Sequence, residues 1–263
     1  MATKRANFTD RQKAEIYALD RALCTYSGKS LWLLDFGGGL GSPNWTDHIV
    51  PASQGGKAEL ENGATASWLY NYTKGSTGRP PMLFLRGYPT VDFFTYHEVL
   101  GEQVADHLQR FSELHWSDWY FNQAVFCVYV AASQKGMRRN DGKAFVRDAN
   151  YWAKAAMSNL EKWRNKSVET GSFKQRGLLP PKIAGDHRVL LQLVDAESLT
   201  AVKRVISAIA PYHLASWNAM EQLSLIETKA EAREFSKWVR ADRHVTMRTK
   251  RAIAENLRRL GLR

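Results

Sequence analysis

Apolar residues recur every three to four positions along most of the chain, and this spacing predicts helices. Side chains at such intervals lie on one face of a helix, so that face can be buried. Thr9 and Gln12 also match the pattern of a capping box at a helix start. The segment Trp116–Gln134 is apolar on nearly every side, which is typical of a core helix. The expected helices are Thr9–Leu23, Val91–Leu114, Trp116–Gln134, Lys143–Lys166, Ala196–Ala210, Tyr212–Leu225, Lys229–Ala241 and Met247–Leu260.

A different pattern between residues 30 and 72 predicts two short strands and one short helix. Ser30–Phe36 is the first strand candidate, and it is broken by Gly37–Gly39. Asn44–Val50 is the second, and Pro51 suits the end of a strand because proline cannot donate to a ladder. Ala58–Tyr72 has the apolar spacing of a helix. The expected order is strand, glycine-rich loop, strand, loop, helix.

Residues that break regular structure divide the rest of the chain. Ser76–Pro89 is rich in proline and glycine and reads as a linker, and Asn165–Gly185 is a second breaker-rich stretch. Val189–Val194 fits either a strand or a helix start. The chain is therefore expected to be mainly α. We expect an N-terminal helix in residues 1–23, a small α/β module in 24–78 and a helical region in 79–263.

Composition supports a folded protein with a polyanionic partner. The 263 residues can bury a substantial core, and 44% are hydrophobic, with nine tryptophans. The formal net charge of +11 suits nucleic-acid binding, because neutralising phosphates supplies much of the affinity. Charge alone is weak support, since solvated basic surfaces are common. Cys24 and Cys127 are far apart and indicate reduced, buried thiols rather than a disulfide framework.

Targeting signals are not evident. Met1–Arg5 is basic but leads into no apolar stretch of the kind found in signal peptides. The apolar run Ala124–Ala132 is too short to span a bilayer. We therefore expect a cytoplasmic protein without a membrane partner.

Polar residues in the small module point to phosphodiester hydrolysis. Asp47 offers a hard oxygen ligand for Mg²⁺ or Mn²⁺. The neighbouring His48 faces the other side of a strand, and a histidine with a pKa near 6.5 accepts protons at neutral pH. Asn71 could complete the coordination of the ion, and Asn62 could bridge backbone groups and hold His48 in place. Such a set suits hydrolysis assisted by one divalent cation.

These residues also resemble a known family. Asp47–Pro51, Ser53, Gly55–Gly56, Asn62 and Asn71–Lys74 resemble the motif of the HNH endonucleases, which have a ββα-metal fold, and the match covers about a quarter of the chain. Fourteen positions from His48 to Asn62 and nine more to Asn71 agree with the family's spacing. The resemblance implies that Asp47 and Asn71 bind the metal. It implies that His48 and Asn62 serve catalysis, His48 as general base and Asn62 as structural support. It also implies a phosphate contact for Lys74.

The chain departs from the family in its cysteines. Many HNH endonucleases carry two Cys-x-x-Cys pairs that hold a structural zinc, whereas only Cys24 and Cys127 are present. Two cysteines without nearby histidines cannot supply four ligands. We therefore expect no structural zinc, and expect Tyr26, Trp32 and Trp68 to stabilise the module by packing instead.

Two basic stretches are candidates for DNA contact. Arg248, Lys250 and Arg251 lie in the last expected helix, which Asp242–Thr246 joins to the helix before it. This pair fits a helix-turn-helix-like unit that reads the major groove. A basic hairpin that contacts only phosphates is the alternative. The second stretch is the loop Lys135–Arg147, with Arg138 and Arg139.

The sequence thus predicts a metal-dependent endonuclease that cuts double-stranded DNA. A sequence-specific type II restriction enzyme fits best, because the helical region is larger than non-specific cutting requires. With one site per subunit, cutting both strands would most simply use a homodimer. The alternatives are a homing or phage HNH nuclease, or a nucleic-acid-binding protein whose nuclease site is vestigial.

Overall fold

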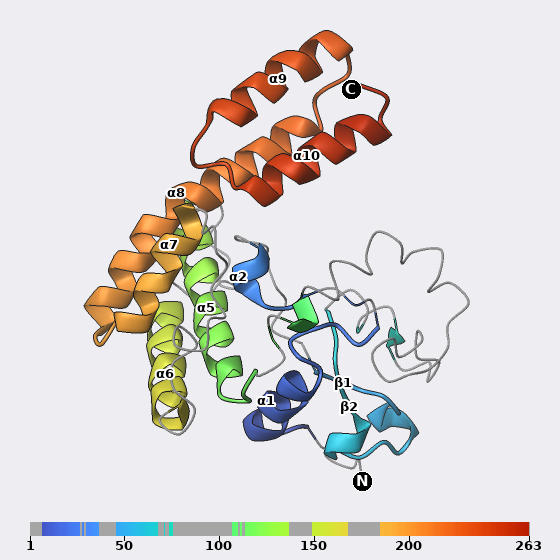
Figure 1. The fold of residues 1–263 in the computed structure, drawn as a ribbon, viewed down its shortest axis with the longest axis vertical. Helices are drawn as coiled ribbons and strands as arrows, with labels where there is room; N and C mark the ends of the chain where they lie inside the picture. The colour runs from blue at the N-terminus through green and yellow to red at the C-terminus, as the bar shows by residue number, and fades with distance from the viewer. Residues whose placement is uncertain are drawn as a thin grey trace, which may run out of the picture. The chain divides into compact units, whose positions relative to one another are not determined.

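The structure is a computed structural model that describes most of the chain. The described residues are 7–26, 28, 30–36, 46–67, 71, 74–75, 107–109, 111, 114–136, 149–167 and 185–262. This part is mainly helical, with one two-stranded sheet, as the apolar spacing predicts (Figure 1). The chain forms two compact units. The first contains Met1–Asp35, Gly41–Gln123 and Glu161–Pro180, and the second contains Phe36–Leu40, Ala124–Leu160 and Pro181–Arg263.

The first helix, α1 (Asp10–Leu19), begins as predicted and ends early. The Thr9 side chain accepts a hydrogen bond from the Gln12 N–H (3.2 Å), and the Gln12 side chain accepts one from the Thr9 N–H (2.9 Å), which confirms the capping box. The helix was expected to reach Leu23. Arg21 and Ala22 instead adopt left-handed backbone angles, with φ of 50° and 57°, and turn the chain away.

The sheet pairs β1 (Thr46–His48) with β2 (Gly63–Thr65) in antiparallel register, with Asp47 opposite Ala64. The prediction of a strand over Asn44–Val50 is therefore confirmed in its centre. The predicted helix over Ala58–Tyr72 is wrong in its first half. A 3₁₀ turn, η2 (Leu60–Asn62), precedes β2 there, while another, η1 (Ala52–Gln54), follows β1.

A helical turn follows β2. The Asn71 N–H donates to the Ser67 carbonyl (3.0 Å), and the Gly75 N–H donates to the Asn71 carbonyl (3.0 Å). Both bonds have the four-residue spacing of an α-helix. The described order is therefore strand, loop, strand, helical turn, and the second strand is Gly63–Thr65 rather than the predicted Asn44–Val50.

The predicted first strand, Ser30–Phe36, is wrong. Residues Leu33–Phe36 form a helical turn, α2. The buried Asn122 side chain accepts from the Leu33 N–H (2.8 Å) and donates to the Leu31 carbonyl (2.9 Å) and the Tyr17 hydroxyl (2.8 Å). These bonds occupy backbone groups that a strand partner would need, so the segment is held by a side chain instead.

The core of the first unit is aromatic. The Trp32 ring lies 5.4 Å from Phe111 and 6.4 Å from Phe121, measured between centroids, and Phe121 lies 5.0 Å from Trp163. Phe121 belongs to α5 (Asp118–Gly136) and Trp163 to α6 (Ala149–Ser167). Both helices agree with the predicted segments where these are described.

The second unit contains α7 (Gly185–Leu191), the 3₁₀ turn η4 (Gln192–Asp195), α8 (Leu199–Leu223), α9 (Lys229–Ala241) and α10 (Met247–Arg259). The last two helices confirm the predictions. The helical character predicted for Ala196–Ala210 and Tyr212–Leu225 is confirmed, but the predicted break between them is wrong, because α8 runs through Pro211. A proline inside a helix costs about 3 kcal/mol, and burying one large aliphatic side chain contributes about 2 kcal/mol. Buried residues on both sides of Pro211, including Ile206, Ile209 and Leu223, therefore offset the cost.

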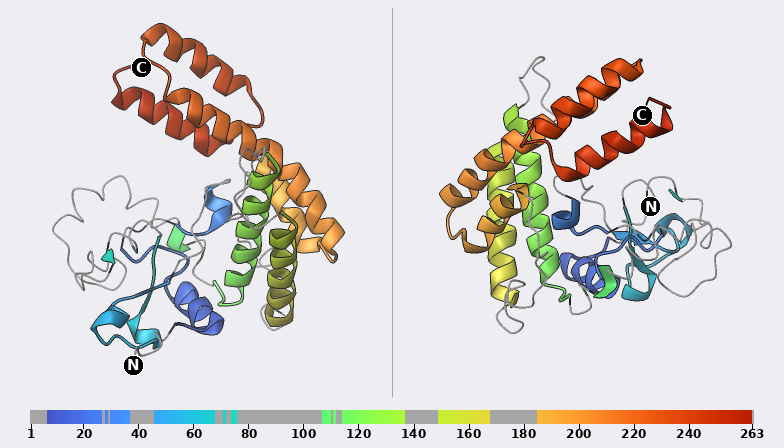
Figure 2. Two further views of the ribbon diagram at one scale, coloured as in Figure 1. Left: turned by 180° about the vertical axis from the view of Figure 1, so that it is seen from behind. Right: turned by 45° about the horizontal axis from the view of Figure 1, so that its top comes forward.

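The C-terminal part of the second unit has its own core. Helices α9 and α10 lie side by side and run in opposite directions next to the end of α8 (Figures 1 and 2). The apolar residues of this core are Ala219, Leu223, Ala232, Phe235, Val239, Val245, Ile253 and Leu257. We call residues 229–259 the basic hairpin.

Several predictions lie outside the described residues. They are the linker Ser76–Pro89, Trp68, most of Val91–Leu114, Arg138 and Arg139. Among the helices that the structure describes, none is both long and apolar enough to cross a membrane. Both cysteines are free and buried, as predicted.

Candidate active site

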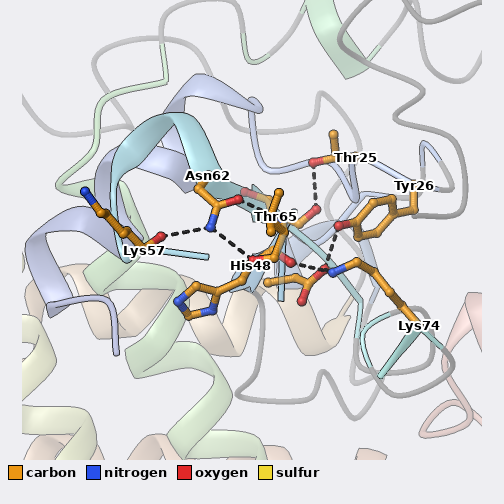
Figure 3. Close-up of polar contacts among 9 residues, drawn as sticks. Thr25, Tyr26, His48, Lys57, Asn62, Thr65 and Lys74 are labelled. Carbon is orange, nitrogen blue, oxygen red and sulfur yellow. Dashed lines mark hydrogen bonds and ion pairs between the residues drawn. The ribbon is translucent and has the colours of Figure 1, made fainter. Parts of the chain in front are cut away.

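Asp47, in the middle of β1, is the centre of the site. Its side chain is only 8% exposed. The Oδ2 atom accepts hydrogen bonds from the Tyr26 hydroxyl (2.6 Å) and the Lys74 ammonium (2.6 Å) (Figure 3). The Oδ1 atom receives no hydrogen bond from the residues that the structure describes. The described residues therefore hold one of the two carboxylate oxygens of Asp47.

Lys74 joins the helical turn to β1. Its side chain is fully buried, and its ammonium donates to the His48 carbonyl as well as to Asp47. The ammonium neutralises the carboxylate, which offsets part of the cost of burying either charge. The phosphate contact implied for Lys74 stays a prediction.

His48 ends β1 and faces away from Tyr26 and Lys74 (Figure 3). Its imidazole packs against Phe8, with ring centroids 4.3 Å apart, and its Nε2 atom is buried. Neighbouring side chains on a strand alternate between its faces, so the side chains of Asp47 and His48 lie on opposite sides of β1.

Asn62 closes the loop between the two strands. Its Oδ1 accepts from the Val50 N–H (2.7 Å), and its Nδ2 donates to the carbonyls of Val50 (3.1 Å) and Lys57 (2.8 Å). Gly56 lies in the same loop, where an added Cβ would meet the Val50 carbonyl oxygen at 1.8 Å. Asn62 and the close approach at Gly56 together fix the backbone that directly follows His48.

Residues after α1 anchor the far end of β2. The Thr25 N–H donates to the Thr65 carbonyl (2.7 Å), and the Thr65 N–H donates to the Asp20 carboxylate (2.7 Å). The Ser67 N–H donates to the Cys24 sulfur (3.3 Å). Hydrogen bonds thus join residues 20–25 to residues 65–67, beside the helical turn that carries Asn71.

Sequence reasoning missed the polar roles of Tyr26 and Asp20. Tyr26 was expected only to pack, yet its hydroxyl donates to Asp47 across 21 positions. Asp20 was expected inside a helix, yet its carboxylate accepts from the Thr25 hydroxyl and the Thr65 N–H. No local motif signals such contacts, because the partners meet only in the folded chain.

The oxygen ligands suit a hard cation held by few protein groups. Among the described residues, no three His, Cys, Asp or Glu side chains come together around one possible ion position. Magnesium commonly binds through one or two carboxylates and keeps several waters. A single carboxylate, that of Asp47, fits that pattern. The amide of Asn71, half-buried on the helical turn, is the predicted second ligand.

The predicted DNA-contact residues of the second unit differ in their surroundings. The Lys250 ammonium donates to the Arg240 carbonyl (2.9 Å). Arg251 is exposed and makes no side-chain hydrogen bond within the described chain. Arg248 lies in α10, and its side chain is outside the described set.

Comparisons with protein-family models, with curated proteins and with solved structures find no match to this chain. The functional inference therefore depends on the site itself.

Proposed function

We propose that this protein is a metal-dependent endonuclease of the HNH type that hydrolyses double-stranded DNA. The observation that carries the proposal is the contact between Lys74 and Asp47 (2.6 Å). It brings the helical turn that contains Asn71 against the strand that contains Asp47 and His48. The described order of strand, loop, strand and helical turn supports the proposal, because a ββα-metal module has its elements in that order.

His48 is the proposed general base. In its neutral form an imidazole accepts a proton from the attacking water. Phe8 packs against the ring and restricts its rotation, while Asn62 fixes the backbone that follows it.

Asp47 and Asn71 are the proposed ligands of Mg²⁺ or Mn²⁺. When bound, the cation stabilises the negative charge that develops on the phosphate and the leaving oxygen. Lys74 already neutralises the Asp47 carboxylate, so the free protein offers a cation little net negative charge. We therefore expect weak metal binding that strengthens when DNA phosphates are present.

Within the nuclease class we propose a sequence-specific restriction enzyme acting as a homodimer. The support is the extent of the helical second unit, which is larger than non-specific cutting requires. A homing or phage nuclease is the nearest alternative. The Lys74 ammonium on Asp47 favours a second candidate, a nucleic-acid-binding protein with a vestigial site, because it occupies one oxygen of the proposed ligand.

Digestion of unmethylated plasmid and phage DNA with Mg²⁺ tests the proposal. The samples are the wild type, the wild type with EDTA, His48→Ala, and His213→Gln as a control histidine in α8. A restriction enzyme would be supported by discrete bands with the wild type and with His213→Gln that are absent with EDTA and with His48→Ala. A smear would support nuclease activity and contradict sequence specificity. Intact DNA throughout, or normal cutting by His48→Ala, would reject the proposed site.

A further inference from the structure

The positive charge of the protein is concentrated at its C-terminal end. Residues 229–263 contain eleven lysines and arginines against four aspartates and glutamates. This excess of seven compares with a net charge of +11 for the whole chain. The nuclease site uses none of these residues.

Some of these basic side chains have partners and others do not. Lys237 pairs with Glu234 (2.8 Å), and Arg259 pairs with Glu255 (2.6 Å). Five exposed arginines make no ion pair or side-chain hydrogen bond with any residue that the structure describes. They are Arg233, Arg240, Arg243, Arg251 and Arg258.

The arginines without partners are regularly spaced on rigid helices. Arg233 and Arg240 are seven positions apart on α9, and Arg251 and Arg258 are seven apart on α10. Seven residues make about two turns, so each pair lies on one side of its helix, about 10 Å apart. The other sides of the helices are buried in the hairpin core. The guanidinium groups are therefore exposed on a backbone that is held in place.

The turn of the hairpin is also held in place. The Thr246 side chain caps α10, and the Thr246 N–H donates to the Ser216 hydroxyl of α8 (3.3 Å). The Lys250 ammonium binds the Arg240 carbonyl near the end of α9. A surface that is ordered before binding loses less conformational entropy when it contacts a partner.

The arrangement of α9 and α10 decides between the two modes of contact that the sequence allows. A helix-turn-helix unit crosses its helices at about 90–120° so that one enters the major groove. Here the helices run side by side in opposite directions (Figures 1 and 2). Such a hairpin presents arginines along its surface and suits contact with phosphates.

We propose that the basic hairpin binds the phosphate backbone of duplex DNA without reading its sequence. Arg233, Arg240, Arg251 and Arg258 are the principal contacts, since guanidinium groups bind phosphate oxygens in a bidentate manner. The choice of DNA as the polyanion rests on the proposed nuclease function. The hairpin then supplies substrate affinity, and any sequence recognition lies elsewhere in the protein.

The salt dependence of DNA binding tests this proposal. Fluorescence anisotropy of a labelled duplex is measured with the full-length protein in EDTA, so that no cutting occurs. The test variants are Arg233→Ala/Arg240→Ala and Arg251→Ala/Arg258→Ala. The matched control, Lys237→Ala/Arg259→Ala, removes the same charge from the same helices, but from residues that already pair with glutamates.

A plot of log K for DNA binding against log salt concentration has a negative slope, and each lost phosphate contact reduces the magnitude of that slope by about 0.9. We expect each test variant to reduce the magnitude by about 2 and the control to reduce it by less than 1. The loss should be equal for duplexes of unrelated sequence. Circular dichroism and thermal unfolding of every variant confirm that these exposed substitutions leave the fold intact.

Three results would overturn the proposal: an unchanged slope in both test variants, an equal loss in the control, or a loss confined to one DNA sequence. No binding of duplex by the wild type would also overturn it. The plasmid digestion tests the nuclease proposal independently of the hairpin proposal. DNA binding with the expected slopes but without cutting would contradict only the nuclease proposal. Cutting by test variants that bind DNA as the wild type does would contradict only the hairpin proposal.

Discussion

At the scale of single residues, the protein depends on a buried charge pair. The Lys74 side chain is fully buried and the Asp47 side chain is 8% exposed, so each charge needs the other. The family resemblance in the sequence predicts Asp47, His48, Asn62 and Asn71 as site residues. It does not reveal that Tyr26 and Lys74 share one oxygen of Asp47, because that contact depends on how the strand and the helical turn pack.

Replacing Lys74 by methionine tests the buried pair. Removing one partner of such a pair leaves an uncompensated charge, which costs about 3–5 kcal/mol. We expect Lys74→Met to lower the free energy of unfolding by about 3 kcal/mol, and Lys74→Met/Asp47→Leu to recover most of the loss. Urea denaturation measures both values. Lys57→Met, at a side chain that is 78% exposed, should change stability by less than about 0.5 kcal/mol. Wild-type stability in Lys74→Met would show that the pair does not form.

Replacing Asn62 by alanine tests the loop closure. Asn62→Ala removes three side-chain hydrogen bonds, to the Val50 N–H and to the carbonyls of Val50 and Lys57. At about 1 kcal/mol for each bond, we expect the free energy of unfolding to fall by about 2–3 kcal/mol. Asn256→Ala, which removes a single bond to the Ala252 carbonyl, is the control and should cost less. Equal losses in the two variants would argue against a special role for Asn62.

At the scale of helices and strands, periodicity predicted where helices occur better than where they end. The starts at Thr9 and Thr228 carry capping boxes, which depend on residues three positions apart. The end of α1 depends on left-handed residues that are not glycine, and the passage of α8 through Pro211 depends on burial along its length. Neither has a local sequence signal.

The capping box of α9 predicts a dependence on pH. Hydrogen bonds from the N–H groups of Glu227 and Thr228 hold the pKa of the Glu231 carboxyl below its usual value of 4.5. A lowered pKa means that the carboxylate stabilises α9 above the ordinary pKa and that this contribution is lost as pH falls through the lowered value. NMR titration should therefore give Glu231 a midpoint below 4.5. The stability difference between the wild type and Glu231→Gln should shrink as the solution is acidified. A midpoint at or above the usual value would contradict the cap.

At the scale of the whole molecule, the chain forms two compact units. Cys24 is buried in the first unit and Cys127 in the second, so each thiol reports on the integrity of one unit. The described structure therefore allows the two units to be followed independently in one experiment.

Both thiols should be protected in the native protein. Burial raises the pKa of Cys127 to about 12, so its reactive thiolate is scarce at pH 8. We expect iodoacetamide to label neither cysteine natively and to label both in urea, with peptide mass spectrometry assigning the sites. If the units unfold separately, Cys24 and Cys127 will become reactive at different urea concentrations. Rapid labelling of either cysteine without urea would contradict its burial.

The sequence by itself determined the mainly α character, the extent of α9 and α10, the capping box at Thr9 and the spacing of the candidate site. These features depend on residues a few positions apart, which local periodicity and motifs report. Tertiary structure decided the second strand at Gly63–Thr65, the helical turn at Leu33–Phe36, the buried pair of Asp47 and Lys74, and the antiparallel course of the basic hairpin. The strand, the helical turn and the buried pair depend on contacts between residues that are far apart in the sequence. The course of the hairpin depends on burial of two helices against the end of α8. No local pattern could therefore specify these features.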